Sequence, residues 1–205
     1  MTFSNETYYA FILGFDHNSL YEGTNKLHMC LGKNASGTQV AFIDSNFAND
    51  ATSGFIMNTT DTNSGGWNNC YMRKTICLQF LNILSTDLQS VITACTKYSD
   101  NTGGGSNTAS YVTETQDKIW LLAEYEVKGK RSYANSAEQN YQQQYSYYTN
   151  GNSAIRYQYD SPSTTCQWYL RSTAGQSFSF IMDSGSVYYT KANQSRGFAP
   201  CFVIG

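Results

Sequence analysis

Charged side chains are scarce in this chain: they make up 14% of its 205 residues, whereas an average globular protein has roughly 25%. The net charge is only −2, and no basic run or Lys/Arg stripe occurs. Binding to a phosphate backbone requires clustered Lys and Arg, so we expect no nucleic-acid partner. Ser, Thr, Asn, Gln, Gly and Tyr fill the deficit, so solubility depends on neutral hydrogen-bonding groups.

Long apolar runs are also missing, and no segment approaches the roughly 20 apolar residues that span a membrane. We therefore expect no membrane insertion. Residues 1–6 (MTFSNE) lack the basic region and apolar run of a secretory signal. The chain is expected to fold without a signal peptide of its own, either in a cytoplasm or as a trimmed piece of something larger. Only two prolines occur, which argues against a proline-rich or collagen-like architecture.

Signatures of common catalytic and metal sites are absent as well. His17 and His28 are the only histidines, and they lie away from any carboxylate-rich motif, so we expect no catalytic or metal role for them. No G-x-S-x-G, H-E-x-x-H or P-loop occurs. The cysteines form no C-x-x-C pair, which favours buried free thiols, with one or two disulfides as the alternative. They are Cys30, Cys70, Cys77, Cys95, Cys166 and Cys201.

Two helices are predicted in the middle of the chain. Apolar residues recur at helical spacing over 71–84, which indicates an amphipathic helix. A second helix is predicted over 86–97, with Ser85 or Thr86 as its N-cap. Its expected buried face consists of Leu88, Val91, Ile92 and Cys95.

Short strands are predicted on both sides of these helices. Residues 7–13 and 39–43 have strand composition, a Thr, Asn, Ser and Gly run over 58–66 predicts a loop, and the apolar run 118–123 predicts a buried central strand. The last forty residues predict a strand meander. Its expected strands are 167–172, 177–182, 186–190 and 200–204.

Residues 132–165 are a tyrosine-rich insertion without clean periodicity. Within 132–159, Tyr, Ser, Asn and Gln supply 20 of the 28 residues, and 137–145 is a candidate short helix. A long polar stretch in a compact domain is usually a functional loop or a disordered linker. Seven tyrosines argue against disorder, because disordered segments are poor in aromatic residues.

Several short motifs follow one another in a fixed order. Residues 65–73 (GGWNNCYMR) are similar to a G-W-x-x-S-x-x-R string, and 117–122 (DKIWLL) to D-K-[IV]-[FW]-L-L. Residues 168–172 (WYLRS) resemble W-W-L-R-S-P, 185–187 (GSV) match G-x-V, and 197–204 (GFAPCFVI) resemble G-V-[RA]-P-x-[FL]-x-[IV]. Together they resemble a bacterial and phage family of domains of unknown function, DUF6273.

The resemblance covers about residues 8–205 and implies one domain over 1–205 that contains the insertion. The fold class that it implies is α+β, similar to the C-type lectins. We therefore expect a C-type-lectin-like fold with two mid-chain helices packed on small antiparallel sheets and with elaborated loops.

The same C-terminal layout occurs in variable proteins that are diversified by retroelements in phages and gut bacteria. In those proteins Asn codons are mutated to codons for Tyr, Ser, Asp and Gly. Residues 169–193 have a similar composition. The chain departs from the family pattern at three positions. Tyr169 replaces a Trp, Thr173 replaces a Pro, and Ala199 replaces a common Arg, which removes a candidate buried ion pair but leaves the expected fold unchanged.

The motif tryptophans and arginines have expected structural roles. Trp67, Trp120 and Trp168 are predicted to pack in the core. Arg73 and Arg171 are predicted to form structural bridges, because a buried guanidinium requires paired acceptors. The candidate carboxylates are Asp117, Glu124 and Glu126.

A polar aromatic surface is the positive functional signal. Tyr offers a large, stiff, amphipathic contact, while Ser, Gly and Asn give adaptable hydrogen bonds, as in evolved binding loops. The candidate ligand-binding residues of the C-terminal segment are Tyr169, Gln176, Ser177, Ser179, Ser186, Tyr188, Tyr189 and Asn193. Those of the insertion are Tyr145, Tyr147, Tyr148, Tyr157 and Tyr159.

These features predict a ligand- or receptor-binding domain of a phage tail or bacterial surface protein, located on the virion or cell surface. The partner would be a protein or glycan on a cell surface. No cofactor is expected, and calcium is an alternative that no motif supports. A structural or oligomerisation domain, forming a homo-oligomer through the tyrosines, is the second hypothesis. A formylglycine-generating type of enzyme, which would use neighbouring Cys166 and Cys201, is the third; we expect no enzyme.

Overall fold

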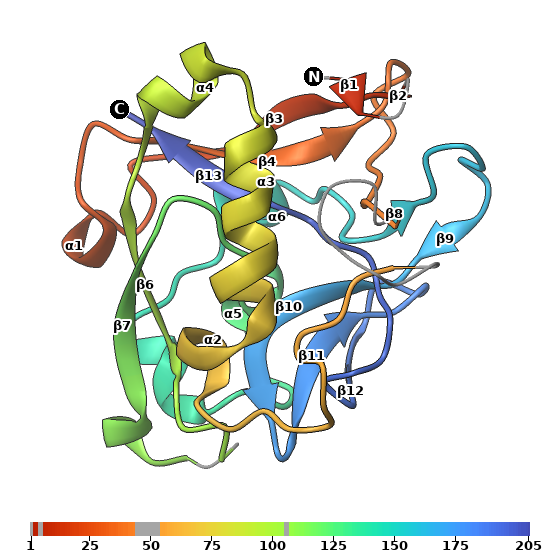
Figure 1. Cartoon of the computed structure of the whole chain (residues 1–205). Helices are drawn as coiled ribbons and strands as arrows, with labels where there is room; N and C mark the ends of the chain where they lie inside the picture. The colour runs from red at the N-terminus through yellow and green to blue at the C-terminus, as the bar shows by residue number, and fades with distance from the viewer. Residues whose placement is uncertain (1, 4–5, 44–53, 105–106) are drawn as a thin grey trace.

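The computed structural model describes residues 2–3, 6–43, 54–104 and 107–205. It has the predicted mixed α+β architecture, with small antiparallel sheets and short helices (Figure 1). Its four-stranded sheet has the order β3-β4-β13-β5, and all pairs in it are antiparallel. The strands are β3 (Tyr9–Phe15), β4 (Leu27–Lys33), β13 (Cys201–Ile204) and β5 (Ile92–Thr93). The strand at the C-terminal end therefore lies between strands from the first half of the chain.

The second sheet has three antiparallel strands in the order β10-β11-β12. They are β10 (Trp168–Ala174), β11 (Ser177–Ile181) and β12 (Val187–Thr190). All seven residues of β10 are buried, whereas Tyr188 and Tyr189 of β12 are exposed. These strands confirm the first three strands of the predicted C-terminal meander, and β12 forms one edge of their sheet. The fourth predicted strand, 200–204, corresponds to β13 and belongs to the four-stranded sheet instead.

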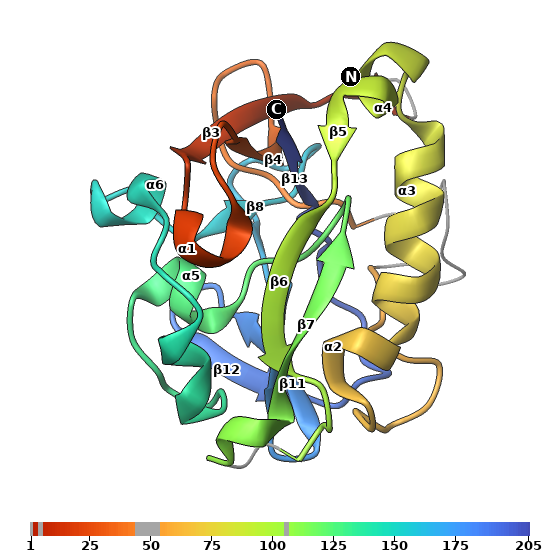
Figure 2. The same ribbon diagram turned by 90° about the vertical axis from the view of Figure 1, so that its left-hand side faces the viewer.

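Three two-stranded ribbons complete the strands of the described residues. They are β1 (Thr2–Phe3) with β2 (Glu6–Thr7), β6 (Cys95–Asp100) with β7 (Val112–Asp117), and β8 (Arg156–Tyr157) with β9 (Thr165–Cys166). In Figure 2 the β6–β7 ribbon runs down the middle of the view, with α3 on one side and α5 and α6 on the other.

The predicted helix over 71–84 is present, with an internal change of pitch. It consists of a π-helical turn, η1 (Met72–Ile76), that continues into α3 (Cys77–Ile83). Met72, Ile76 and Phe80 are fully buried. The apolar spacing that indicated the helix is therefore the stripe that packs on the core.

The other helices are short. They are α1 (Ser19–Glu22), α2 (Gly66–Asn69), α4 (Thr86–Val91), α5 (Glu124–Lys128) and α6 (Ser146–Thr149), with 3₁₀ turns η2 (Ala109–Tyr111) and η3 (Ser136–Asn140). The predicted helix over 137–145 is wrong, because only the η3 turn overlaps it.

The predicted helix over 86–97 is wrong beyond residue 91. Ser85 is the N-cap and its side chain accepts a hydrogen bond from Leu88 N, but the helix ends at Val91. The chain then continues as β5 and β6. Ile92 pairs with Ile204, and Cys95 pairs with Asp117. Partners distant in sequence thus outweigh the local helical spacing, and Val91 is exposed rather than buried.

The predicted strands over 118–123 and 39–43 are only partly regular. Residues 119–123 are buried as expected, but their ladder contact is a single bridge between Trp120 and Cys201. In residues 39–43 the pairing is limited to bridges at Gln39, Val40 and Phe42. Both segments are held as extended connections between sheets.

Candidate functional site

Strand β10 forms a buried frame beneath the C-terminal segment. Trp168 Nε1 donates a hydrogen bond to Ala154 O at 2.9 Å. The Tyr169 hydroxyl donates to Lys191 O at 3.1 Å and to Gln194 O at 2.6 Å. The frame therefore fixes both the insertion and the segment that follows β12.

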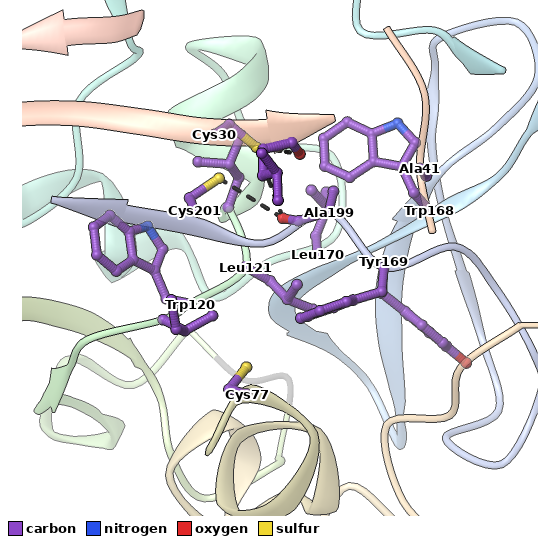
Figure 3. Close-up of a cluster of buried hydrophobic side chains, with 14 of the residues drawn as sticks. Cys30, Ala41, Cys77, Trp120, Leu121, Trp168, Tyr169, Leu170, Ala199 and Cys201 are labelled. Carbon is purple, nitrogen blue, oxygen red and sulfur yellow. Dashed lines mark hydrogen bonds between the residues drawn. The ribbon is translucent and has the colours of Figure 1, made fainter. Parts of the chain in front are cut away.

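The three tryptophans confirm their predicted role in the core. Trp67, Trp120 and Trp168 are each 0% exposed. Figure 3 shows Trp120 and Trp168 among Leu170, Cys201 and other apolar side chains of the core.

Arg171 confirms its predicted structural bridge, with Glu126 as the partner. Arg171 Nη1 lies 2.5 Å from Glu126 Oε2, and Nη2 lies 2.7 Å from Oε1. Arg171 also donates to Ser99 Oγ and Leu121 O. Burial alone would raise the pKa of Glu126, but the charges of Arg171 and Lys97 hold this pKa well below its usual range. Both side chains are fully buried, so the pair stabilises the core and does not face a ligand.

Arg73 forms the second predicted bridge, with Asp117. The Arg73 Nε to Asp117 Oδ1 distance is 2.6 Å. Trp67 Nε1 donates to the other oxygen of Asp117 at 2.9 Å. The first motif is thereby joined to the end of β7, which explains why Gly-Trp and Arg occur together in it.

Glu124 has a different role from the other two predicted acceptors. Its carboxylate accepts hydrogen bonds from the backbone N–H groups of Ser132, Tyr133 and Ala134. This carboxylate fixes the start of the insertion and, with it, the position of Tyr133.

The histidines lie in a buried polar cluster, contrary to the expectation that they are remote from carboxylates. His28 Nδ1 lies 3.6 Å from Glu22 Oε2 and 3.1 Å from the Tyr145 hydroxyl. Burial and the nearby charge of Lys97 lower the pKa of His17 to about 3 and that of His28 to about 2, so both rings are neutral.

Two sets of residues in this cluster have the spacing of a metal site. Glu22 and His28 with Cys95, or Glu22 with His17 and Glu126, place ligand atoms within 4.8 Å of one another. However, Lys97 Nζ lies 2.6 Å from Glu22 Oε2 and 3.5 Å from Glu126 Oε1. The ammonium of Lys97 occupies the position that a cation would take, so the cluster is an internal ion-pair network.

The predicted ligand-binding residues divide into three groups by exposure. Gln176, Ser186, Tyr188, Tyr189 and Asn193 are exposed, and all five belong to the segment around β11 and β12. The half-buried group consists of Ser177, Tyr147, Tyr157 and Tyr159. The buried group consists of Tyr145, Tyr148, Tyr169 and Ser179.

The buried group does not belong to a contact surface, and its assignment as ligand-binding requires correction. Tyr145 is 0% exposed because its ring stacks on His17 at 3.6 Å and its hydroxyl accepts a hydrogen bond from Lys97 Nζ at 3.0 Å. Tyr169 is 0% exposed because its hydroxyl bonds to the backbone of the segment after β12. Tyr148 and Ser179 are also enclosed by the core.

The half-buried tyrosines of the insertion pack on the N-terminal strands. The ring centroids of Tyr147 and Phe11 lie 4.8 Å apart, and those of Tyr159 and Tyr8 also lie 4.8 Å apart. The Tyr159 hydroxyl also bonds to the backbone of Thr7. These tyrosines thus connect the insertion to β2 and β3, and only part of each ring faces solvent.

Two of the exposed residues lie on the edge strand β12, and the other three lie in the turns and the segment next to β11 and β12. We call this surface the β12 edge and define it as Tyr133, Gln176, Ser186, Tyr188, Tyr189 and Asn193. Tyr188 and Tyr189 are 44% and 41% exposed, and their rings stack at 4.8 Å. The Tyr133 ring packs edge-on against both, with centroid distances of 5.8 Å to Tyr188 and 5.0 Å to Tyr189. The three rings support one another, so little side-chain freedom remains to be lost on binding.

A polar pocket adjoins this edge at Gln176. The Gln176 pocket has a volume of about 470 Å³ and contains small polar and glycine residues almost exclusively. Its lining residues are Asp61, Thr62, Asn63, Ser64, Thr102, Gly103, Gly104 and Gln176. Asp61 is paired with Lys191, which follows β12, at 3.0 Å. The pocket and the β12 edge are therefore parts of one surface.

Interlocked loops hold the Gln176 pocket in shape. Asn63 Nδ2 donates to Gly175 O at 2.8 Å and to Ser177 O at 2.9 Å, which fixes the turn between β10 and β11. Gly103 has a φ of +79°, and a Cβ atom there would lie 2.0 Å from Asn63 O. Only glycine permits so close a backbone approach at this position.

Sequence reasoning missed Tyr133 and the pocket loops. Tyr133 belongs to the tyrosine-rich insertion, but its position beside β12 depends on Glu124, nine residues earlier. Residues 61–64 were predicted as loop only. Their run of neutral hydrogen-bonding side chains next to glycines was the available signal for a polar site.

The cysteines of the described residues are all buried and free. Cys201 was expected near Cys166, but its partner across the β4–β13 ladder is Cys30. Cys166 lies on β9, where its Sγ contacts Gln167 O. Burial raises the pKa of the Cys166 thiol to about 12, so this thiol is protonated at neutral pH.

These features define an α+β domain with a buried motif frame that supports an exposed polar aromatic edge. The family model described as "Domain of unknown function (DUF6273)" matches residues 42–205, and the chain belongs to this family. No curated protein and no solved structure matches the chain. Among the described residues, no helix has the length and apolar character required to cross a membrane.

Proposed function

We propose that the chain is a ligand- or receptor-binding domain with a C-type-lectin-like fold, from a phage tail or bacterial surface protein. Its binding surface would be the β12 edge together with the Gln176 pocket. The observation that carries this proposal is the position of the exposed predicted residues: all five lie on the single segment around β11 and β12, and β11 pairs with the fully buried strand β10. The ligand would be a protein or glycan on a cell surface.

The chemistry of the surface supports a neutral, hydrogen-bonding ligand. The lining of the pocket offers hydroxyl, amide and backbone groups, and its one carboxylate is paired with Lys191. Stacked tyrosines contribute large contact areas at low entropic cost, and aromatic residues are common among the residues that dominate binding energy.

We further propose that the β12 edge is a diversified segment, as in retroelement-diversified variable proteins. Side chains that face solvent at Ser186, Tyr188, Tyr189 and Asn193 can change without creating cavities in the core. A neighbouring reverse-transcriptase gene and a near-identical template repeat of the coding sequence for residues 169–193 are expected in the genome. Absence of both contradicts diversification but leaves the binding proposal intact.

Binding is tested with the purified chain on a glycan array and on a panel of bacterial cells. We expect binding that falls at least tenfold in Tyr188→Ala and in Tyr189→Ala. Tyr9→Ala is the matched control, because Tyr9 is 48% exposed but lies on β3, in the other sheet. No binding by the wild-type chain, or equal loss in all three variants, contradicts the proposal.

An oligomerisation domain is the second candidate function. It is favoured by exposed apolar side chains at the N-terminal part of the chain, where Ile12, Phe15 and Leu20 are 44%, 72% and 83% exposed. Such side chains are often covered by a partner. Size-exclusion chromatography with light scattering tests this function: a stable oligomer that Leu20→Glu converts to a monomer, without any ligand binding, would favour it over the first proposal.

A further inference from the structure

Arg156 is a buried cation to which the described part of the chain offers no carboxylate partner. Its side chain is 0% exposed, and no Asp or Glu among the described residues pairs with it. Nη1 donates to Val40 O at 2.9 Å, and Nη2 donates to the Cys30 sulfur at 3.2 Å. The guanidinium lies over the Trp168 ring at 4.7 Å. Arginine remains protonated in proteins, and a buried charge requires an anion nearby.

Cys30 is the group in contact with Arg156 that can supply this anion. Burial alone would raise the pKa of the Cys30 thiol, but a hydrogen bond from Cys201 and the charge of Arg156 lower it to about 7. For the equally buried Cys70, burial is not offset, and the pKa rises to about 12. The contact with Arg156 therefore favours the thiolate form of Cys30, whereas the protonated thiol can donate a hydrogen bond to Pro200 O at 3.3 Å.

Cys30 and Cys201 face each other across two antiparallel strands. They are register partners on β4 and β13, and Figure 3 shows their sulfur atoms on the same side of the sheet. Leu31 N donates to Pro200 O in the next pair along the ladder, so Cys30 and Cys201 occupy a non-hydrogen-bonded pair. The Cα atoms of such a pair are about 4.5 Å apart. That spacing lies within the range that a disulfide can bridge.

We propose that Cys30 and Cys201 are a site of reversible oxidative modification, in which a small hydroperoxide converts the two thiols to a cross-strand disulfide. The Cys30 thiolate attacks the terminal oxygen of the hydroperoxide, the O–O bond breaks, and the departing alkoxide, or hydroxide in the case of hydrogen peroxide, takes up a proton and leaves as an alcohol or water. Cys30 is then a sulfenic acid. Cys201 attacks the Cys30 sulfur, the S–S bond forms and the S–O bond breaks. The hydroxyl group leaves as water with the proton of Cys201. A dithiol reductant reverses the change.

Oxidation would also alter the environment of Arg156. A disulfide is neutral, so the guanidinium would lose its anion while remaining in the core. Arg156 belongs to β8, inside the tyrosine-rich insertion. The packing of β8 against Trp168 is therefore expected to change with the oxidation state of the two thiols.

The experiment treats the reduced, folded chain with hydrogen peroxide and then alkylates the remaining thiols in denaturant before mass spectrometry. We expect a Cys30–Cys201 cross-linked peptide to form at least tenfold faster than Cys70, Cys77 or Cys166 is oxidised. These three thiols are internal controls, because they are also buried but have raised pKa values. Cys166 is more exposed than Cys30, at 7% against 0%, so accessibility alone would favour it.

Two variants separate the steps of this reaction. In Cys201→Ser the formation of the disulfide is blocked. A sulfenic acid should therefore accumulate on Cys30, and dimedone should trap it. In Cys166→Ser the cross-link should form at the wild-type rate. Oxidation of all thiols at similar rates, or a cross-link between Cys166 and Cys201, overturns the proposal. Since the readout is the linked peptide, the result does not depend on whether a ligand is found for the β12 edge.

Discussion

Individual charged residues have large effects in this chain because there are few of them and several are buried. Glu138 is one example. Its carboxylate is 0% exposed, accepts a hydrogen bond from Asp100 N, and also accepts hydrogen bonds from Gln142 and Ser172. Burial outweighs these hydrogen bonds and raises the pKa of Glu138 to about 7. The folded chain therefore holds a proton that the unfolded chain releases at lower pH.

The contribution of Glu138 to stability should fall as the pH rises from about 4.5 to about 7, and this fall should be absent in Glu138→Gln. The buried neutral histidines change stability in the opposite direction in both proteins, so the difference between wild type and Glu138→Gln isolates Glu138. The sign follows from linkage: the folded-state pKa lies above the unfolded one, so the contribution of Glu138 is complete below pH 4.5 and lost as the pH approaches 7. The loss is on the order of 3 kcal/mol. Urea unfolding at a series of pH values measures it.

Glu114→Gln is the control for this experiment, since Glu114 is exposed on β7. The difference in unfolding free energy between wild type and Glu138→Gln should vary with pH, whereas that between wild type and Glu114→Gln should remain flat. Parallel curves for all three proteins would show that Glu138 does not titrate in this window.

The two predicted arginine bridges should differ in their contribution to stability. Arg171→Met leaves Glu126 fully buried with only Lys97 as a counter-charge, which should cost roughly 3–5 kcal/mol. The Arg73 side chain is 20% exposed, so water can replace part of its bridge in Arg73→Met. We expect a smaller cost of about 1–3 kcal/mol there, because the buried carboxylate partner of Arg73 keeps its two other side-chain hydrogen bonds. Equal losses in chemical denaturation would contradict the assignment of Arg171 as the buried anchor.

At the scale of elements, the sequence predicted those whose pattern is set locally. The stripe of Met72, Ile76 and Phe80 predicted the helix, and alternation predicted the strands of the C-terminal meander. It failed at residues 92–97, because Ile92 and Cys95 have helical spacing but pair with residues near 204 and 117. Such pairing depends on partners far along the chain, which a local pattern does not contain.

The loop contacts around the Gln176 pocket are another case in which distant partners determine structure. Gly103→Ala should destabilise the chain by at least about 2 kcal/mol more than Gly175→Ala. Both glycines have positive φ, at +79° and +56°, so both variants carry a conformational penalty. A Cβ at Gly175 meets nothing within 4 Å, whereas one at Gly103 would overlap Asn63 O. Thermal unfolding compares the two variants. Equal decreases in Tm would show that the close approach of Gly103 to Asn63 does not contribute to stability.

At the scale of the whole molecule, tyrosines divide between a frame and a surface. The composition predicted that tyrosines form a binding surface. It did not distinguish Tyr145, which stacks on His17 in the core, from Tyr189, which faces solvent. The distinction depends on which partner each ring meets after folding. The tyrosine-rich insertion lacks the apolar alternation that would reveal an inward face, so its buried Tyr145 and its half-buried Tyr147 have similar sequence neighbourhoods.

This division predicts that stability and binding are altered by different tyrosines. Tyr145→Phe removes the hydroxyl that accepts the hydrogen bond from Lys97 Nζ, which should cost about 1–3 kcal/mol in unfolding free energy. The folded fraction should bind with wild-type affinity, because Tyr145 is enclosed by the core. Tyr189→Ala should reduce affinity at least tenfold while lowering stability by less than about 1 kcal/mol.

Both quantities can be measured on the same samples, by urea unfolding and by titration with the ligand that the array identifies. Tyr133→Ala extends the test, because Tyr133 supports the rings of Tyr188 and Tyr189 from the insertion. It should weaken binding less than Tyr189→Ala but more than Tyr9→Ala. If Tyr145→Phe weakened binding at unchanged stability, the buried tyrosines would contribute to ligand binding. The division of the tyrosines into a structural set and a binding set would then be wrong.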